Sequence, residues 1–262
     1  MKAFFTEPHY NKDTKNNLES HIQDKSFSQW LSRCTQSHKK NYYRSVTLSL
    51  KSNHQAPGDA TSEQMQYVAD LADEYSFGEI RVSHEQNLIL ADVHEDNLYE
   101  LWNKAKNHHL ATPNIGLITD IICCPGGDFC SLANAKSIPI AESIQQVFDD
   151  MDYLHDIGDI NLNISGCMNA CGHHHVGHIG ILGVDKDGSE WYQVTLGGNQ
   201  GNFANIGKVI GPSFSADEMP VVIRKIVDTY VKERHSDETF IDCVIRIGLE
   251  PFKLNVYEKK AN

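Results

Sequence analysis

Four cysteines in two close pairs constrain this chain more than any other feature. Cys124 and Cys130 form a C-x5-C pair in CPGGDFC, and Cys167 and Cys171 form a C-x3-C pair in GCMNAC, with 36 residues between the pairs. Four thiolates that converge on one inorganic core are the usual ligands of a cubane iron–sulfur cluster, and two short loops can supply two thiolates each. The pattern therefore predicts an iron–sulfur cluster.

Glycines flank both cysteine pairs. Gly126 and Gly127 lie in the first loop, and Gly166 and Gly172 lie on either side of the second. Because glycine has no side chain, the backbone can approach a bulky group closely and adopt positive φ angles without a clash. The glycines therefore favour two tight loops around a cluster.

The same cysteines could instead belong to a zinc site or to structural disulfides. A zinc site usually has tighter cysteine pairs, and a C-x5-C loop is wide for one tetrahedral ion. Disulfide frameworks are typical of small secreted chains, whereas the opening MKAFFTEPHYNKDTKNN has no apolar run like a signal peptide. Cys34 and Cys243 are most simply ordinary thiols. Cys123 stands beside Cys124 and could replace it as a ligand, although only Cys124 gives the x5 spacing.

Composition limits the class of protein. The 262 residues are 40% hydrophobic without an apolar stretch that could span a bilayer, which indicates one or two compact cytoplasmic domains and no membrane partner. A net charge of −12 without a long basic run argues against nucleic acid as a partner.

The pattern of residues 41–110 indicates one compact subdomain, preceded in residues 1–40 by an N-terminal extension or linker. Alternation near 46–50 predicts a half-buried strand, and Thr61 with Gln64 fits the capping box of a helix. Short strands are expected at 79–83 and 87–91. The first helix has its apolar stripe at Met65, Val68, Ala69, Ala72 and Tyr75, and a second helix has its stripe at Leu98, Leu101, Trp102 and Ala105.

Residues 111–255 have a different pattern. A helical stretch is expected from about 131 to 154, interrupted near Pro139, and then a short strand at 161–165 that leads into the second cysteine pair. Strands at 178–184 and 191–196 form a hairpin around the turn sequence DKDG. Ser215 and Glu218 cap a last helix, whose apolar face is Ile223, Ile226, Val227, Tyr230 and Val231. The fold class is α+β.

Several runs resemble the sulfite and nitrite reductase hemoproteins, which hold a 4Fe-4S cluster coupled to siroheme. CPGGDFCSLANAKSIPIA and SGCMNACGHHHVGHIGILG resemble their cluster-binding region, and YQVTLGGN resembles a segment that follows it. PGDATSEQMQYVADLADEYSFGEIRVSHEQNLIL resembles their second ferredoxin-like half-domain. The resemblance covers roughly residues 25–255. It implies a ferredoxin-like half-domain over 41–110 followed by an α+β siroheme/4Fe-4S-binding domain over 111–255.

The resemblance also implies roles for the cysteines. Cys124, Cys130, Cys167 and Cys171 would each bind one cluster iron, and Cys171 would in addition bridge the cluster to the siroheme iron, which makes it the catalytic thiolate. A thiolate shared by both centres gives electrons a short path to the substrate.

Further cofactor contacts are expected in the second loop and in the half-domain. Asn169, Ala170 and their backbone amides would contact the cluster or the macrocycle. His173 is a further candidate contact. It and the histidines after it could bind another metal, lie near the acidic groups of the macrocycle, or form a polar layer outside the residues that touch the cofactors, and we favour this layer over direct ligation. Arg81, Gln86 and Asn87 could line the cavity, although Arg81 is equally a surface charge.

The implied reaction is the six-electron reduction of sulfite to sulfide or of nitrite to ammonia, with GHHHVGHIG favouring sulfite. No flavin or nicotinamide motif is present, so electrons would come from ferredoxin or a flavoprotein reductase. The alternatives are an iron–sulfur electron-transfer subunit without its own catalytic centre and a zinc-stabilised binding module.

Charge suggests that the chain is incomplete as an enzyme. Siroheme carries eight carboxylates and the substrate is a small anion, so the site needs several fixed cations. The sequence has no arginine between Arg81 and Arg224. The family's first half, which this chain does not resemble, supplies most of those cations. We therefore expect a partner, either an N-terminal hemoprotein half or a second copy of the chain.

Overall fold

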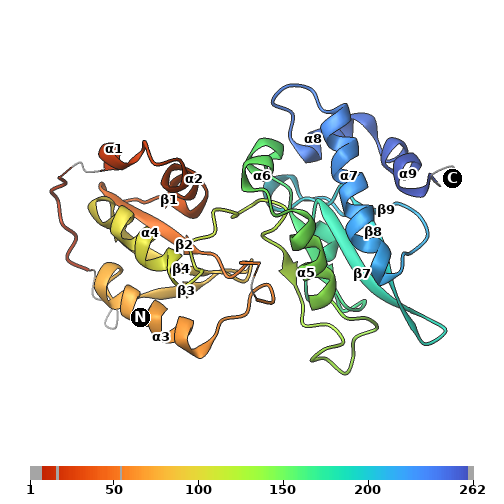
Figure 1. Cartoon of the computed structure of the whole chain (residues 1–262), viewed down its shortest axis with the longest axis horizontal. Coiled ribbons are helices and arrows are strands. Elements are labelled where there is room, and N and C mark those ends of the chain that lie inside the picture. The colour runs from red at the N-terminus through yellow and green to blue at the C-terminus, as the bar shows by residue number, and fades with distance from the viewer. Residues whose placement is uncertain (1–7, 16–17, 54, 259–262) are drawn as a thin grey trace. The chain divides into compact units, whose positions relative to one another are not determined.

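The computed structural model describes residues 8–15, 18–53 and 55–258. Contacts divide the chain into two compact units. The first consists of Met1–Ser52 and Asp59–Ile115, and the second consists of Asn53–Gly58 and Gly116–Asn262. Each unit has its own buried apolar cluster. Both units combine helices with a sheet, which confirms the α+β class (Figure 1).

The first unit contains a four-stranded antiparallel sheet in the order β1-β2-β4-β3. Its strands are β1 (Thr35–Ser37), β2 (Tyr43–Leu48), β3 (Ile80–Val82) and β4 (Leu88–His94). In β2, Val46 and Leu48 are buried and Thr47 between them is less so, as period-two patterning predicts for a strand with one covered face. Tyr43 is buried as well, and a register shift between Arg44 and Val46 separates it from them. The edge strand β3 is exposed along its whole length.

In the described ranges, four helices accompany this sheet: α1 (Leu18–His21), α2 (Lys25–Cys34), α3 (Ser62–Tyr75) and α4 (Leu98–Lys106), which follows the 3-10 turn η2 (Glu95–Asn97). The predicted capping box at Thr61 and Gln64 is present, and the stripe predicted for α4 is buried as expected. In α3, however, Met65 is 52% exposed and Leu71 is buried in its place. The buried face of α3 is thus rotated relative to the predicted one.

Helix α2 lies within the segment that was expected to be an extension or linker. Asp24 caps its start by accepting hydrogen bonds from two backbone amides, and Phe27, Trp30 and Cys34 are fully buried in the core of the first unit. The described part of residues 18–37 is therefore folded into this unit. The sequence analysis missed this helix because the segment is polar overall and the apolar face of α2 is narrow.

The second unit contains a five-stranded mixed sheet in the order β5-β6-β7-β8-β9. Its strands are β5 (Ile122–Cys123), β6 (Leu162–Ser165), β7 (Ile179–Lys186), β8 (Ser189–Leu196) and β9 (Lys208–Val209). The first three are mutually parallel, and the β7–β8 hairpin is antiparallel, as predicted. Asp187 and Gly188 form its two-residue turn with φ of 54° and 79°, which suits the twist of a hairpin.

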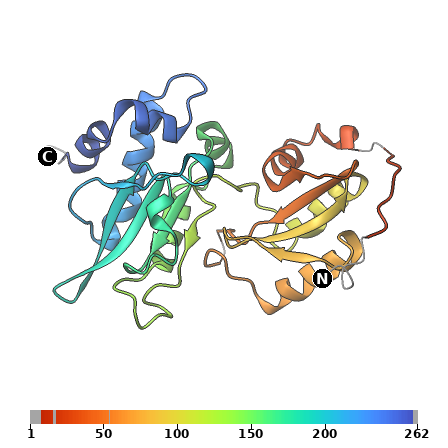
Figure 2. The same ribbon diagram turned by 180° about the vertical axis from the view of Figure 1, so that it is seen from behind.

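Helices α5 (Ile138–Val147) and α7 (Met219–Glu233) lie on one face of this sheet, as Figures 1 and 2 show from opposite sides. The remaining elements are α6 (Met151–Ile157), α8 (Phe240–Ile247), α9 (Glu250–Tyr257), and the 3-10 turns η3 (His174–Val176), η4 (Gly201–Phe203) and η5 (Ala216–Glu218). The capping box of Ser215 and Glu218 is present, but it opens the turn η5 that directly precedes α7 and not α7 itself. Val231, predicted on the apolar face of α7, is 36% exposed.

Pro139 does not interrupt a helix, as the sequence suggested, but stands in the first turn of α5. The first turn needs no amide donor from that position, so proline is tolerated there. Residues 131–137 form a loop of turns and not a helix. This loop packs against the second cysteine pair through backbone hydrogen bonds to Gly166.

Candidate metal centre

Both cysteine pairs start at the carboxyl ends of neighbouring parallel strands. Cys124 directly follows β5, and Cys167 comes two residues after β6. Because β5 and β6 pair in parallel with Cys123 opposite Ile164, their carboxyl ends meet at one edge of the sheet. This edge is where open sheets with parallel strands usually bind ligands. The strand pairing therefore brings together loops that are 36 residues apart in sequence.

Backbone hydrogen bonds lock the two loops to each other. The Cys124 amide donates to the Ile164 carbonyl at 3.1 Å, and the Gly166 amide donates to the Cys124 Sγ at 3.1 Å. The Gly166 carbonyl accepts from the amides of Asn134 and Ala135 at 2.8 and 3.0 Å. Gly166 of the second loop is thus held by three residues of the first.

The glycines make this contact possible. A Cβ on Gly166 would lie 2.6 Å from the Ala135 carbonyl oxygen and 2.8 Å from the Gly126 Cα. A Cβ on Gly126, whose φ is 59°, would lie 2.5 Å from the Ser137 amide nitrogen. Gly127 differs, because a Cβ there would have no contact shorter than 3.4 Å. Close approach of the two loops accordingly depends on Gly126 and Gly166.

The four cysteines differ in exposure in a graded manner. Cys124 and Cys167 are 9% and 7% exposed, Cys130 is half-buried and Cys171 is exposed. Large apolar side chains beside them are also exposed: Phe129 by 80%, Leu132 by 72% and Met168 by 82%. An apolar surface of this kind around thiols is typical of a region that another group covers.

No three His, Cys, Asp or Glu side chains among the described residues are grouped closely enough to hold one metal ion. A cubane cluster binds each thiolate through a different iron, so its cysteines stand farther apart than the ligands of a single ion. The two interlocked loops, with sulfur donors on both, fit the donor set that such a cluster needs.

The other three cysteines lie in the apolar cores. Cys123 is 4% exposed, belongs to the core of the second unit, and donates its thiol hydrogen to the Cys124 carbonyl at 3.2 Å. Cys123 therefore faces the core, whereas the Cys124 sulfur accepts a hydrogen bond from Gly166 of the second loop. Cys34 and Cys243 are fully buried, and burial raises the pKa of the Cys243 thiol.

Cys171 lies in a backbone segment of unusual conformation. The neighbouring residues Ala170 and His173 have φ of 57° and 54°, in the left-handed region that residues other than glycine seldom adopt. Asn169 and His173 are exposed beside Cys171, and Ala170 is half-buried. The structure thus places these three predicted cofactor contacts in the loop that carries Cys171. Strained backbone of this kind is concentrated at functional sites.

The histidines that follow divide into exposed and buried ones. His173 and His175 are exposed, whereas His174 is 1% and His178 is 6% exposed. Burial, together with the neighbouring His175, lowers the pKa of His174 to about 4, and burial also lowers the pKa of His178. Both buried rings are therefore neutral at pH 7. His178 Nδ1 accepts a hydrogen bond from the Asn161 amide at 3.2 Å.

The three predicted cavity residues of the half-domain lie in the first unit. Arg81 is exposed on β3 and forms an ion pair with Glu79. Asn87 is 1% exposed and accepts a hydrogen bond from the Leu50 amide at 3.0 Å, which joins two segments of the first unit. Gln86 has a φ of 60° just before it. Arg81 and Asn87 thus have structural partners of their own.

Three polar residues around the cysteine loops were not predicted. Ser137 Oγ lies 3.5 Å from the Cys124 Sγ, and Asn163 and Ser165 of β6 are buried and hydrogen-bonded to the second loop. The sequence does carry a weak signal for Asn163 and Ser165, because they alternate with Leu162 and Ile164 in a short strand. A polar face on a buried strand indicates a buried polar partner.

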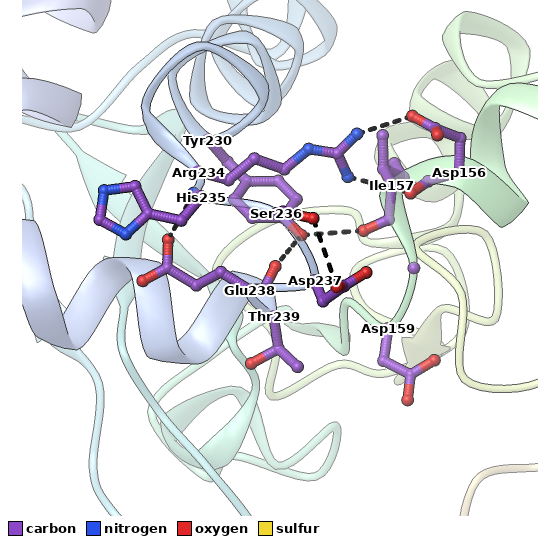
Figure 3. A pocket seen from close by; sticks show the side chains of 11 residues that line it. Asp156, Ile157, Asp159, Tyr230, Arg234, His235, Ser236, Asp237, Glu238 and Thr239 are labelled. Carbon is purple, nitrogen blue, oxygen red and sulfur yellow. Dashed lines mark hydrogen bonds and ion pairs between the residues drawn. The ribbon is translucent and has the colours of Figure 1, made fainter.

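A cavity of about 460 Å³ lies elsewhere in the second unit, between the end of α6, the end of α7 and residues 235–239 (Figure 3). Four of its eleven lining residues are acidic, and its arginine, Arg234, already forms an ion pair with Asp156 at 2.7 Å. Tyr230 spans it by donating to the carbonyls of Ile157 and Glu238. None of the seven cysteines lines this cavity.

No helix in the described part of the chain is long and apolar enough to cross a membrane.

Comparison with known proteins identifies both units. The family described as the nitrite and sulphite reductase 4Fe-4S domain matches residues 116–262, and the nitrite/sulfite reductase ferredoxin-like half domain matches residues 36–108. Among solved structures, the NirA protein of Mycobacterium tuberculosis has a TM-score of 0.68 and 26% identity, with 83% of this chain and 40% of that one covered. Dissimilatory sulfite reductase I shares the fold, with a TM-score of 0.66 at 13% identity, and 83% of this chain and 69% of that one are covered.

Curated relatives are much longer than this chain. The assimilatory ferredoxin-dependent nitrite reductase of Haloferax mediterranei is 30% identical over 71% of the chain and 32% of the relative. The sulfite reductase [NADPH] hemoprotein beta-component of Yersinia pestis is 29% identical over 70% of the chain and 31% of the relative. The chain thus spans about a third of their length. Because the 4Fe-4S domain alone matches more than half of the 262 residues, including both cysteine pairs, this chain belongs to the nitrite and sulphite reductase family.

Proposed function

We propose that this chain is the cluster-bearing part of a reductase that converts sulfite to sulfide, or nitrite to ammonia, with six electrons. The observation that supports this most directly is the convergence of the two cysteine pairs at the carboxyl ends of β5 and β6, with Gly166 bonded to the Cys124 sulfur. Family membership gives that arrangement its chemistry.

The proposed ligands of a 4Fe-4S cluster are Cys124, Cys130, Cys167 and Cys171. Cys171 is also the proposed bridge to siroheme, since its thiol is the exposed one of the four. When bound, the cluster and the siroheme supply the electrons and the iron at which the anion is reduced. Asn169, Ala170 and His173 would contact these cofactors from the same loop.

The remaining residues of the site prepare the loops. Burial of Cys124 and Cys167 keeps water from two of the ligand sulfurs, and the Ser137 hydroxyl and Gly166 amide provide hydrogen bonds to one of them. Hydrogen bonds to cluster sulfurs and exclusion of solvent are the means by which proteins set cluster potentials.

The proposal includes a second polypeptide part, supplied by an N-terminal hemoprotein half or by a second copy of this chain. Lys136, the lysine next to the first cysteine pair, already has a carboxylate partner 3.6 Å away in Asp128. No arginine occurs between Arg81 and Arg224. The cations that hold the siroheme carboxylates and the substrate anion must then come largely from the partner. The exposed Phe129, Leu132 and Met168 are the surface that this partner would cover.

The proposed electron donor rests on the names of the relatives and not on a motif of this chain. Their names specify ferredoxin in one case and NADPH in the other. We propose a ferredoxin or a flavoprotein reductase as the donor.

The first test is an anaerobic visible spectrum with iron and labile sulfide contents, measured on the chain produced together with siroheme synthesis. We expect partial siroheme bands from the chain alone and, with a complementary N-terminal half added, full bands and about five irons per chain, four in the cluster and one in the macrocycle. Cys171→Ser should lose the siroheme bands, whereas Cys243→Ser, which alters a buried thiol in the core, should keep them. A cluster without siroheme even after the partner half is added would favour the electron-transfer subunit instead.

The second test concerns the partner. Mixing the chain with a complementary N-terminal half should raise both siroheme occupancy and reductase activity. Full turnover by the purified monomer would contradict the proposed need for a partner.

A further inference from the structure

Two buried side chains of β6 hold the peptide that follows Cys171. Ser165 Oγ accepts a hydrogen bond from the Gly172 amide at 3.1 Å. Asn163 Nδ2 donates to the Gly172 carbonyl at 2.9 Å and to the His173 carbonyl at 3.4 Å. Both groups of Gly172 are therefore bound by side chains that project from the same face of one strand.

Gly172 is also pressed against the strand. A Cβ at this position would lie 1.9 Å from the Ile164 carbonyl oxygen, so that only glycine fits. The backbone on both sides of Cys171 has left-handed residues, Ala170 and His173. The Cys171 side chain itself is exposed and gains little position from packing. Its location depends on the backbone, and the backbone is fixed to β6 at Gly172.

The two side chains are costly to bury. Asn163 is fully buried and Ser165 is 1% exposed, and the Asn163 Oδ1 has no hydrogen-bond partner among the described residues. Leu162 and Ile164, the other two residues of β6, lie in the apolar core. A buried amide with an unpaired oxygen weakens the fold relative to an apolar side chain. The cost of burying this amide is explained if its Nδ2 group, which binds the loop, has a structural role.

We propose that Asn163 and Ser165 are positioning residues for Cys171, which set the place of its thiolate by fixing the Gly172 peptide to β6. This inference rests on the proposed function, because it assigns a purpose to the position of one proposed cluster ligand. It concerns residues that act through the backbone of the loop and not through the cofactors themselves.

The test uses the full chain, purified anaerobically and reconstituted with iron and sulfide. Ser165→Ala removes the acceptor of the Gly172 amide, and Asn163→Ala removes the donor to its carbonyl. Ser165→Thr keeps the hydroxyl. Thr229→Val is the matched control, since Thr229 is a buried residue of α7 whose hydroxyl is hydrogen-bonded to Lys225 and Asn255. Iron content, melting temperature, the midpoint potential and the electron paramagnetic resonance spectrum of the reduced cluster are measured for each.

We expect Ser165→Ala and Asn163→Ala to shift both the resonance g values and the midpoint potential, Ser165→Thr to restore them, and Thr229→Val to leave them unchanged. A lower melting temperature with the wild-type spectrum and potential in both variants would overturn the inference alone, because the two residues would then serve only the fold. A wild-type chain that takes up no cluster would overturn the proposed function, and this inference with it.

Discussion

Among the four proposed ligands, Cys124 has the most elaborate surroundings. Its sulfur accepts a hydrogen bond from the Gly166 amide at 3.1 Å and lies 3.5 Å from the Ser137 hydroxyl. Ser137 is fully buried, so its hydroxyl has no water to compete for it. When Cys124 is a thiolate, both groups must donate to it. The negative charge at this sulfur is therefore better stabilised than at an isolated buried thiolate.

Removing the Ser137 donor should make the cluster harder to reduce. Reduction adds negative charge, part of which resides on the ligand sulfurs, and a lost hydrogen bond disfavours the reduced state. We expect Ser137→Ala to keep the wild-type iron content and to lower the cluster midpoint potential, as measured by redox titration of the visible spectrum. Ser143→Ala is the control, because its hydroxyl bonds to the Ile140 carbonyl of α5. An unchanged potential in Ser137→Ala would exclude this role.

At the residue scale, the sequence was informative about chemistry and less so about contacts. The spacing of four cysteines indicated the site. The x5 spacing favoured Cys124 as the ligand, and the structure places Cys123 in the core. Ser137 could not be predicted, because its importance arises from a contact with Cys124 that only the fold creates. Asn163 left only a weak signal, as a polar residue of an alternating strand, and its bond to Gly172 is visible only in the structure. Met65 was predicted to be buried but is exposed, because the sequence of α3 contains two overlapping apolar stripes and either could face the core.

At the scale of elements, the site depends on parallel pairing of two short strands. The sequence predicted the strand before the second cysteine pair, but β5 has only two residues and gave no periodic signal. Parallel pairing also needs a long connection, and α5 and α6 provide it. The β7–β8 hairpin, in contrast, could be predicted, because the local sequence DKDG favours a tight turn. Local geometry was therefore predicted better than long-range pairing.

Contact between the two cysteine loops should be the most sensitive feature at this scale. In Gly166→Ala the new methyl group would overlap the Ala135 carbonyl and Gly126, which forces the loops apart. We expect a destabilisation of about 1–3 kcal/mol, as for overpacked cores, and a large loss of cluster iron. Thermal melts and iron analysis test this expectation.

Gly127→Ala is the matched control for that substitution. Gly127 lies in the same loop as Gly126, but a methyl group there would meet its neighbours at 3.4 Å, which is ordinary van der Waals contact. It should retain the wild-type iron content. Equal loss of iron in the two variants would mean that any added methyl group in these loops disturbs the cluster, and that close approach at Gly166 is not special.

At the scale of the molecule, two properties of the chain support the proposed partner. The net charge of −12 is opposite to what an anion-reducing site needs, and the lysine beside the cysteines is paired with Asp128. Large apolar side chains are exposed on both cysteine loops. A second polypeptide part that carries cations and an apolar contact surface would satisfy both conditions together. The relatives, more than twice as long, have room for such a part in one chain.

If that surface is where the partner binds, making it polar should prevent association while leaving the cluster intact. Leu132 and Met168 are 72% and 82% exposed, so replacing both with glutamine removes apolar contact area without disturbing the core. We expect the double variant Leu132→Gln/Met168→Gln to keep its iron content and to bind a complementary N-terminal half at least tenfold more weakly, equivalent to about 1.4 kcal/mol. Leu254→Gln changes a side chain of α9 that is 63% exposed and should bind as the wild type does. Sedimentation velocity of the mixtures measures both. Equal binding by the two variants would locate the partner on another surface, and the exposed apolar residues of the cysteine loops would then be left to contact the macrocycle alone.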